Sequence, residues 1–204
     1  MTRPHADLED YYEKEARLRK RGSPREARVR LRDEYLALLD AEGRRTVVDF
    51  GAGPGQDGDG LEAAGFCYVG LDLAHGNGVL AAERGITTIQ GSITAVPFGP
   101  ASFDAGWSMS TLMHLDAADA ALAVAEMVAT LTPGAPFLFG MWGCETGASV
   151  TQSDGVPGAT RPFHVRTFDH NRTLLIEHGD VDRADRWVGA SGEWDYHVLQ
   201  LRAP

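Results

Sequence analysis

Cysteine is scarce in this sequence, which has 204 residues and two cysteines, Cys67 and Cys144. They form no Cys-x-x-Cys pair and no Cys/His cluster, so the sequence predicts no metal site. Cys67 lies in the apolar run FCYVGLDL, where we expect a buried free thiol. This cysteine usage predicts a reduced, cytoplasmic protein.

Long apolar runs are also missing. No stretch approaches the roughly 18–20 apolar residues that a helix needs to span a bilayer. The first 21 residues contain no apolar segment of the kind found in secretory signals. We therefore expect neither a membrane segment nor a secretory signal.

Basic residues are few beyond the N-terminal region. Residues 46–204 contain 7 Lys and Arg against 19 Asp and Glu, whereas residues 1–45 contain 12 against 10, and the net charge is −10. Nucleic-acid binding requires a basic face that neutralises phosphates, so a nucleic-acid partner is not expected. The acidic body is compatible with a cationic ligand, and equally with ordinary solvated acids.

The first 45 residues are helix-forming and are predicted to make an N-terminal helical cap on a single globular unit, residues 46–204. The chain is charged from Ala6 to about Arg21. Ser23 followed by Pro24 and Glu26 has the spacing of a capping box that begins a second helix. Its apolar residues recur at helical spacing, and Gly43 is a plausible stop.

From residue 46 the pattern alternates between short apolar strands and helices, which predicts an α/β fold with a mostly parallel sheet covered on both faces. Residues 143–160 are rich in Gly, Ser and Thr and are predicted to be a long functional loop. Expected strands are 46–50, 66–71, 87–90, 105–108, 137–141, 182–188 and 195–201, and expected helices are 58–64, 80–84, 117–131 and 167–178.

The segment VVDFGAGPGQDG, residues 47–58, places a glycine-rich turn directly after the first of these strands. Open α/β sheets bind ligands at this position, and glycines let backbone N–H groups approach a ligand closely. The dinucleotide pattern G-x-G-x-x-G is not met, because Gln56 occupies its last position. Asp49 precedes the glycines and suits a ligand with a positive ammonium group. Asp72 ends the next strand, where a carboxylate can accept hydrogen bonds from a ribose.

These motifs, together with QGSITAVPFGPASFDAGWSMSTLMHL and MVATLTPGAPFLFGMWG, resemble the class I S-adenosylmethionine (SAM)-dependent methyltransferases of the small-molecule type. The resemblance covers about residues 46–142. It implies a Rossmann-like three-layer sandwich with a seven-stranded, mostly parallel sheet and an antiparallel last strand. Two positions depart from the family pattern: Ser92 stands where the family often has Asp, and Ala135 where it usually has Gly.

The resemblance also implies a cofactor, SAM, with S-adenosylhomocysteine as product, and residue roles for it. The methionine part would lie against Asp49 and the glycine loop, the ribose against Asp72, and the sulfonium near the end of the fourth strand. For Asp49 the alternative is a turn cap, and for Asp72 a helix cap. The implied cofactor-binding residues are Asp49, Gly51, Ala52, Gly53, Gly55, Asp72, Leu73, Ser92, Ile93, Trp107, Ser108 and Met109.

His114 follows the fourth strand and is the candidate general base, because histidine titrates near neutral pH. The alternative is a histidine that only packs at a helix start. Other residues lie in segments where such folds meet the methyl acceptor, and the arginines among them could bind a carboxylate or phosphate. These candidate substrate residues are Tyr12, Trp142, Arg161, His164 and Arg166.

The sequence thus predicts an enzyme that moves a methyl group to an O or N atom of a small molecule, as a monomer or homodimer. Three alternatives remain open. One is a methyltransferase acting on a peptide or protein, with residues 143–166 and the N-terminal helices as a groove. The others are a non-catalytic SAM- or nucleotide-binding module and, less favoured, a nicotinamide dehydrogenase.

Overall fold

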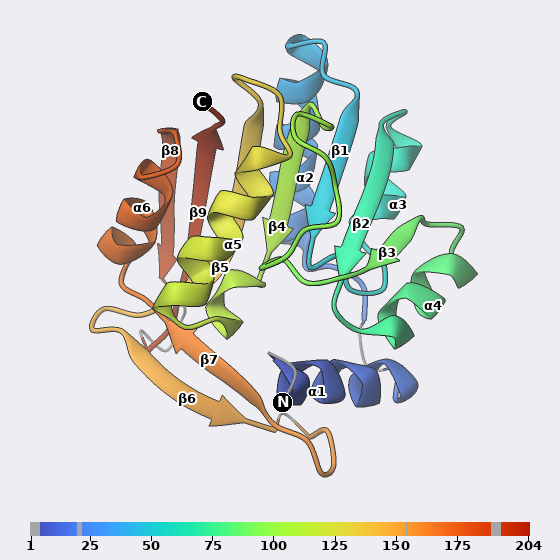
Figure 1. Cartoon of the computed structure of the whole chain (residues 1–204), viewed down its shortest axis with the longest axis vertical. Helices are drawn as coiled ribbons and strands as arrows, with labels where there is room; N and C mark the ends of the chain where they lie inside the picture. Colours follow the sequence, from blue (N-terminus) through green and yellow to red (C-terminus); the bar gives the residue numbers. More distant parts are fainter. Residues whose placement is uncertain (1–4, 20–21, 154, 189–192) are drawn as a thin grey trace.

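A seven-stranded sheet forms the centre of the protein in the computed structural model, which describes residues 5–19, 22–153, 155–188 and 193–204 (Figure 1). The strand order is β3-β2-β1-β4-β5-β9-β8. Strands β1 to β5 pair in parallel, and β9 runs antiparallel to both of its neighbours. The predicted fold, with an antiparallel last strand, is confirmed. The strands are β1 (Thr46–Phe50), β2 (Cys67–Asp72), β3 (Thr88–Gln90), β4 (Ala105–Met109), β5 (Pro136–Gly143), β8 (Asp180–Val188) and β9 (Asp195–Arg202).

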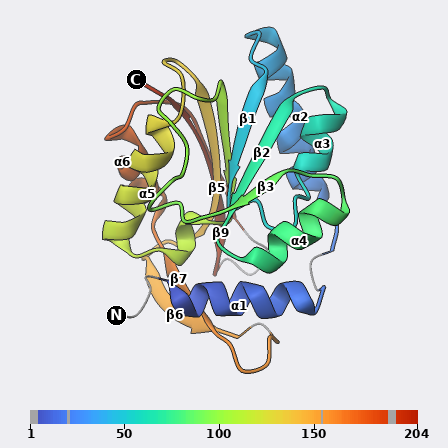
Figure 2. The same cartoon turned by 45° about the vertical axis from the view of Figure 1, so that its right-hand side comes forward.

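Helices cover both faces of this sheet and complete three layers (Figure 2). On one face lie α5 and α6, and on the other lie α2, α3 and α4. The bounds are α2 (Glu26–Ala41), α3 (Gly58–Ala63), α4 (His75–Glu83), α5 (Ala117–Ala129) and α6 (Phe168–Ile176).

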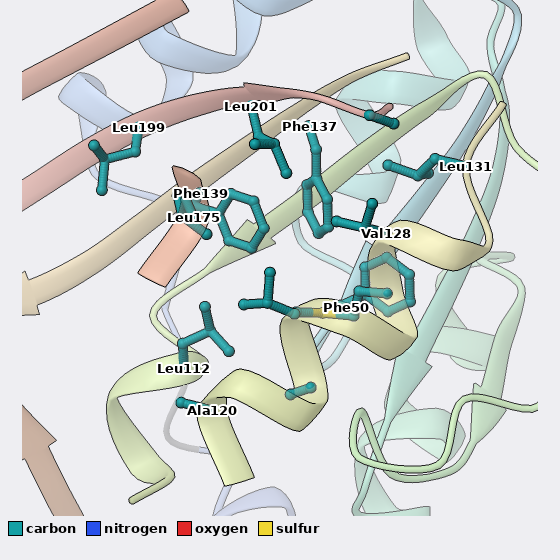
Figure 3. Packing of buried hydrophobic residues seen from close by; sticks show 14 of the residues in the cluster. Phe50, Leu112, Ala120, Val128, Leu131, Phe137, Phe139, Leu175, Leu199 and Leu201 are labelled. Carbon is teal, nitrogen blue, oxygen red and sulfur yellow. The ribbon is translucent and has the colours of Figure 1, made fainter. Parts of the chain in front are cut away.

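The larger core cluster fills the space between the sheet and α5 with α6 (Figure 3). Phe137 and Phe139 of β5 stack with ring centroids 3.9 Å apart, and Phe50 of β1 lies 5.5 Å from Phe137. All three rings are buried, and Val128 and Met127 of α5 pack against the same cluster. This cluster fixes β1, whose carboxyl end carries the predicted glycine turn, and the neighbouring β5.

The second core cluster joins α2 to the opposite face. Leu31, Tyr35 and Leu39 recur every four residues and are buried, as the helical spacing predicts. The buried Tyr35 hydroxyl donates to the carbonyl oxygens of Gly106 (2.8 Å) and Pro136 (2.7 Å). α2 is therefore part of the sandwich, although it belongs to the predicted N-terminal cap.

Helix α1 (Ala6–Arg17) takes a different place: it crosses the carboxyl ends of the parallel strands (Figures 1 and 2). Beside it lies a hairpin of β6 (Ala148–Gln152) and β7 (Arg161–Val165), which forms a separate two-stranded sheet. The division of the chain at residue 45 stays a prediction.

Three sequence-based expectations are wrong. Residues 148–152, inside the predicted loop 143–160, form a strand that pairs with residues 161–165, since the cross-strand pairing outweighs their Gly- and Ser-rich surroundings. The capping box is not formed: α2 begins at Glu26 after Arg25, and no side chain caps it. Cys67 is exposed because it stands at the first position of β2, before the buried part of the strand.

Among the described residues, no helix has both the length and the apolar character that a membrane crossing requires. Within the same ranges, His, Cys, Asp and Glu side chains form no group of three that could hold a metal ion.

Candidate active site

A pocket opens at the carboxyl ends of β1, β2 and β4, and α1 forms its roof. It is a cleft that is partly open to solvent. Gly51, Asp72 and Met109 line its floor, and Leu8 and Tyr12 of α1 line its roof. The pocket thus lies at the edge where the parallel strands of an α/β sheet present ligand-binding residues.

The glycine turn after β1 gives this pocket a floor of bare backbone. Gly51 has φ +82°, a conformation that residues with a Cβ rarely adopt, and a Cβ there would clash with Thr111. Its N–H donates to the Leu71 carbonyl oxygen at 2.8 Å, which ties the turn to the end of β2. Only glycine therefore lets β1, β2 and Thr111 meet so closely.

Asp72 both lines the pocket and holds the glycine turn. Its Oδ2 accepts the Gly53 N–H at 2.7 Å, and its Oδ1 accepts the N–H of Ala74 (2.9 Å) and the amide of Asn77 (3.0 Å). The helix-cap alternative is therefore part of its role, because Ala74 and Asn77 belong to the start of α4. The same carboxylate also faces the pocket.

A buried polar network lies outside the pocket lining. The Asp57 Oδ2 accepts the Arg28 Nε–H and the Trp107 Nε1–H, both at 2.8 Å. The Tyr68 hydroxyl donates to Asp49 Oδ2 at 2.9 Å, while Asp49 Oδ1 has no hydrogen-bond partner among the described residues. Burial, reinforced by the nearby charge of Asp57, raises the pKa of Asp49 to about 8. Burial lowers the pKa of Arg28, but the charge and hydrogen bonds of Asp57 raise it by more, so the pKa of Arg28 is raised overall.

His114 is held inside the pocket by two hydrogen bonds. It lies on a short 3₁₀ helix (Leu112–His114) after β4 and is 4% exposed. Its Nδ1 is 2.8 Å from the Pro162 carbonyl oxygen, which can only accept, so the proton of the neutral ring is on Nδ1. Its Nε2 is 2.8 Å from the Tyr12 hydroxyl and therefore accepts from it. The Arg161 Nη1 donates to the same hydroxyl at 2.7 Å.

This arrangement joins three distant segments at one point: α1 through Tyr12, the turn after β4 through His114, and β7 through Arg161. The Arg161 guanidinium also lies 4.8 Å from the ring centroids of Tyr11 and Phe163. Such cation–π contacts fix the guanidinium where it meets the Tyr12 hydroxyl.

The pocket gathers eight of the predicted residues. They are Gly51, Asp72, Leu73, Ser92, Ile93 and Met109 of the cofactor set, together with Tyr12 and His114. The remaining members of the cofactor set lie outside its lining: Asp49, Ala52, Gly53, Gly55, Trp107 and Ser108. Of these, Ser108 donates its hydroxyl to the Phe50 carbonyl oxygen at 2.9 Å.

The other candidate substrate residues also lie outside the pocket lining and have local partners. Trp142 packs edge-on against Tyr196, with centroids 5.3 Å apart. His164 hydrogen-bonds Ser149 across the hairpin at 3.1 Å. Arg166 donates to three carbonyl oxygens, those of Leu112, Leu115 and Asp116, and so holds the turn that carries His114.

Several lining residues have no recognisable signal in the sequence. His5 and Leu8 lie more than a hundred residues before His114 and reach the pocket only because α1 folds over it. Ser110 also lines the pocket and has φ +60°. Its sequence context resembles a strand, so this left-handed conformation could not be predicted.

Residues 47–134 match a protein-family model described as a methyltransferase domain. Residues 47–134 are therefore similar to a methyltransferase domain. This match includes the glycine turn, Asp72 and His114. Helix α1 lies before the matched residues, and the β6–β7 hairpin lies after them.

Solved structures share the fold of this chain. A Pyrococcus horikoshii OT3 protein is 17% identical with a TM-score of 0.71, and the alignment covers 89% of this chain and 92% of that one. A Burkholderia thailandensis 1,6-didemethyltoxoflavin-N1-methyltransferase, solved with 1,6-didemethyltoxoflavin and S-adenosylhomocysteine, is 20% identical with a TM-score of 0.73, covering 100% and 91%. A Haemonchus contortus phosphoethanolamine N-methyltransferase is 14% identical with a TM-score of 0.66, covering 84% and 52%.

The pocket lining fits SAM, the cofactor that the resemblance implies. A nucleoside with an amino-acid tail needs a carboxylate for its ribose, an apolar slot for its base and exposed backbone for its tail. Asp72 would supply the first, Leu73 and Ile93 the second, and Gly51 the third.

Asp72 gives a direct test of this fit. We expect Asp72→Ala to weaken binding of S-adenosylhomocysteine by about 5- to 150-fold, equivalent to about 1–3 kcal/mol for a lost charged hydrogen-bond partner. Titration calorimetry measures the effect, and Glu62→Gln, on the exposed face of α3, is the control. Wild-type affinity in Asp72→Ala would remove Asp72 from the ribose role.

Proposed function

We propose that this protein transfers a methyl group from SAM to an O or N atom of a small molecule. The hydrogen bond between Tyr12 and His114, inside a pocket roofed by α1, is the observation that carries the proposal. In its neutral form, with the proton on Nδ1, the imidazole would present an unprotonated Nε2 to the Tyr12 hydroxyl beside the pocket. Such a group is what an acceptor that arrives as a hydroxyl or ammonium requires, because it must lose a proton.

The cofactor roles follow the pocket lining. Asp72 would bind the ribose hydroxyls, and Leu73, Ser92 and Ile93 would border the adenine. The backbone at Gly51 would meet the methionine part, with Asp49 beneath it, and Met109 would lie near the sulfonium. When bound, SAM supplies a methyl group on a good leaving group.

The protein contributes alignment and proton removal. Holding the acceptor in line with the methyl group can supply about 7–11 kcal/mol of the barrier. As the acceptor atom bonds to the methyl carbon, its proton passes to the Tyr12 oxygen, and the Tyr12 hydroxyl proton passes to His114 Nε2. The Nδ1–H bond to Pro162 keeps the ring oriented, and Arg161 holds Tyr12 in place.

The pocket favours a small molecule over a peptide. A peptide substrate needs an extended groove between α1 and the hairpin. Here the two are joined by the bond from Arg161 to Tyr12 and by the Lys14 ammonium, which donates to the Gly158 carbonyl oxygen at 2.8 Å. The acidic body likewise disfavours nucleic acid, and the predictions of a cytoplasmic protein and a small-molecule partner stay part of this proposal.

The proposal is tested in two steps. Titration with S-adenosylhomocysteine and, separately, with NAD establishes the cofactor, and we expect micromolar binding of the former alone. Release of S-adenosylhomocysteine from SAM is then measured with a panel of phenols, heteroaromatic N–H compounds, amines and a peptide library. Turnover with peptides alone would favour the protein-directed alternative, and binding without turnover on any compound would favour the non-catalytic module.

A further inference from the structure

Strand β8 leaves one edge of the central sheet open. It is the last strand in the order, and its outer side pairs with no other strand in the described part of the chain. It is nine residues long, and most of its side chains are exposed or half-buried. Figure 1 shows it at the end of the sheet, away from α1. A long strand with free N–H and C=O groups on one side is a template for pairing with another strand.

The charges along β8 are arranged antisymmetrically about its middle residue, Ala184. At one residue and at two residues from Ala184, a basic residue on one side corresponds to an acidic residue on the other side. Arg183 is matched by Asp185, and Asp182 by Arg186. The register of β8 shifts between Val181 and Arg183, and the strand is regular from Arg183 onward. Two copies placed antiparallel about Ala184 would therefore put Arg183 and Asp185 of each copy against opposite charges.

We propose that β8 pairs with β8 of a second copy of this chain, about a two-fold axis at Ala184. Arg183 would then oppose the partner's Asp185, and Asp185 the partner's Arg183. Directly opposed ion pairs on an antiparallel ladder are favourable, and like charges there are unfavourable. A two-fold contact of this kind is self-complementary and closes after two chains.

The ends and the centre of β8 fit the same pairing. Ala184 is exposed and small, so two copies can approach at the axis without a clash. Trp187 and Val188, at the C-terminal end, are 38% and 64% exposed and rank among the large apolar side chains left uncovered. Pairing of two copies at this edge would bring a second chain next to this exposed apolar end.

The charges of β8 already have partners within the chain, and the proposed contact extends those pairs. Arg183 contacts Asp185 at 2.7 Å and Glu34 at 3.2 Å. Arg186 contacts Asp195 at 2.7 Å, and Asp182 accepts from Arg202 at 2.7 Å. Like charges placed directly opposite each other would repel a second copy. This edge carries both signs in matched positions.

The test is the molar mass of the full chain in solution, measured by sedimentation equilibrium from 1 to 100 µM. We expect a mass that rises toward twice that of the chain, with weaker association at high salt because the ion pairs are at the surface.

Charge variants test the pairing itself. In Asp185→Arg, Arg183 of each copy would face an arginine of the other copy, which should weaken association at least tenfold. The double variant Arg183→Asp with Asp185→Arg restores opposite charges and should restore association. Glu62→Arg, on α3, makes the same charge change away from the edge and should leave association unchanged.

Amide hydrogen exchange keeps the proposal testable if a variant folds poorly. In the wild-type protein, amides of β8 should exchange more slowly at 100 µM than at 1 µM, whereas amides of β6 should not change. A wild-type protein that is monomeric at 100 µM would overturn the proposal. So would a dimer that Asp185→Arg leaves intact, because the contact would then lie elsewhere. Neither result bears on methyl transfer.

Discussion

Replacing His114 by alanine should lower the rate of methyl transfer by about 10²- to 10⁴-fold, the usual contribution of a general base, with little change in affinity for S-adenosylhomocysteine. The expectation follows from the atoms that His114 presents. Its Nδ1–H is fixed on the Pro162 carbonyl oxygen, so Nε2 is the nitrogen that can take a proton. The alanine variant removes that nitrogen and leaves Gly51 and Asp72, which line the cofactor part of the pocket, in place.

Tyr12→Phe should produce a loss of similar size, because the Tyr12 hydroxyl stands between the pocket and His114 Nε2. Tyr11→Phe is the matched control: it removes a hydroxyl from the neighbouring ring, whose centroid is 5.2 Å from that of Tyr12. We expect it to retain most of the activity. The measurement is the release of S-adenosylhomocysteine with the acceptor that the panel identifies, under saturating SAM.

The two variants separate chemistry from packing. If His114 only packs, His114→Ala lowers the stability of the protein while the turnover per folded molecule stays near that of the wild type. If Tyr12 and His114 act as one proton-accepting unit, the double variant should lose little more than either single one, because both remove the same step. Full activity in Tyr12→Phe would assign the proton transfer to His114 alone.

Much of the fold could be predicted from the sequence because its signals are local. The strands 46–50 and 105–108 and the helix from Ala117 follow from apolar runs and turns within each segment, and the structure places them within one or two residues. The hairpin of β6 and β7 could not be found this way. Its five cross-strand pairs, from Ala148 with Val165 to Gln152 with Arg161, exist only once the two segments meet.

The candidate site divides along the same line. Gly51, Asp72 and Ile93 were predicted because each ends a strand or turn in a recognisable motif, and all three line the pocket. Asp57 and Arg28 were missed, although their ion pair lies directly among the predicted residues Asp49 and Trp107. Nothing near Arg28 in the sequence marks it, since a helical arginine is usually solvated and only the packing of α2 buries this one.

Asp49→Asn should make the cofactor-free protein less sensitive to pH and more stable than the wild type at pH 8. The pKa of Asp49 is raised to about 8, first by burial and then by the charge of Asp57, with a smaller contribution from Asp72. Arg28 and the Tyr68 hydroxyl act in the opposite direction but do not cancel this. In the unfolded chain an aspartate titrates near 4.

The sign follows from proton binding. Between about pH 4 and pH 8 the folded protein holds a proton on Asp49 that the unfolded chain has lost, so the free energy of unfolding falls as the pH rises. The slope is at most about 1.4 kcal/mol per pH unit, which amounts to about 3–4 kcal/mol between pH 5 and pH 8. An asparagine stays neutral and can still accept the hydrogen bond from the Tyr68 hydroxyl. Its contribution to the free energy of unfolding therefore does not change between pH 5 and pH 8.

The measurement is urea unfolding of both proteins at pH 5 and pH 8, without cofactor. Taking the difference between variant and wild type at each pH removes the other titrating groups, which the two proteins share. We expect the variant to gain stability relative to the wild type by several kcal/mol on going from pH 5 to pH 8. Asp40→Asn is the control, because Asp40 is 72% exposed and paired only with Arg45. If the stability difference between variant and wild type is the same at pH 5 and pH 8, Asp49 is ionised at both pH values. Arg28 would then balance its negative charge.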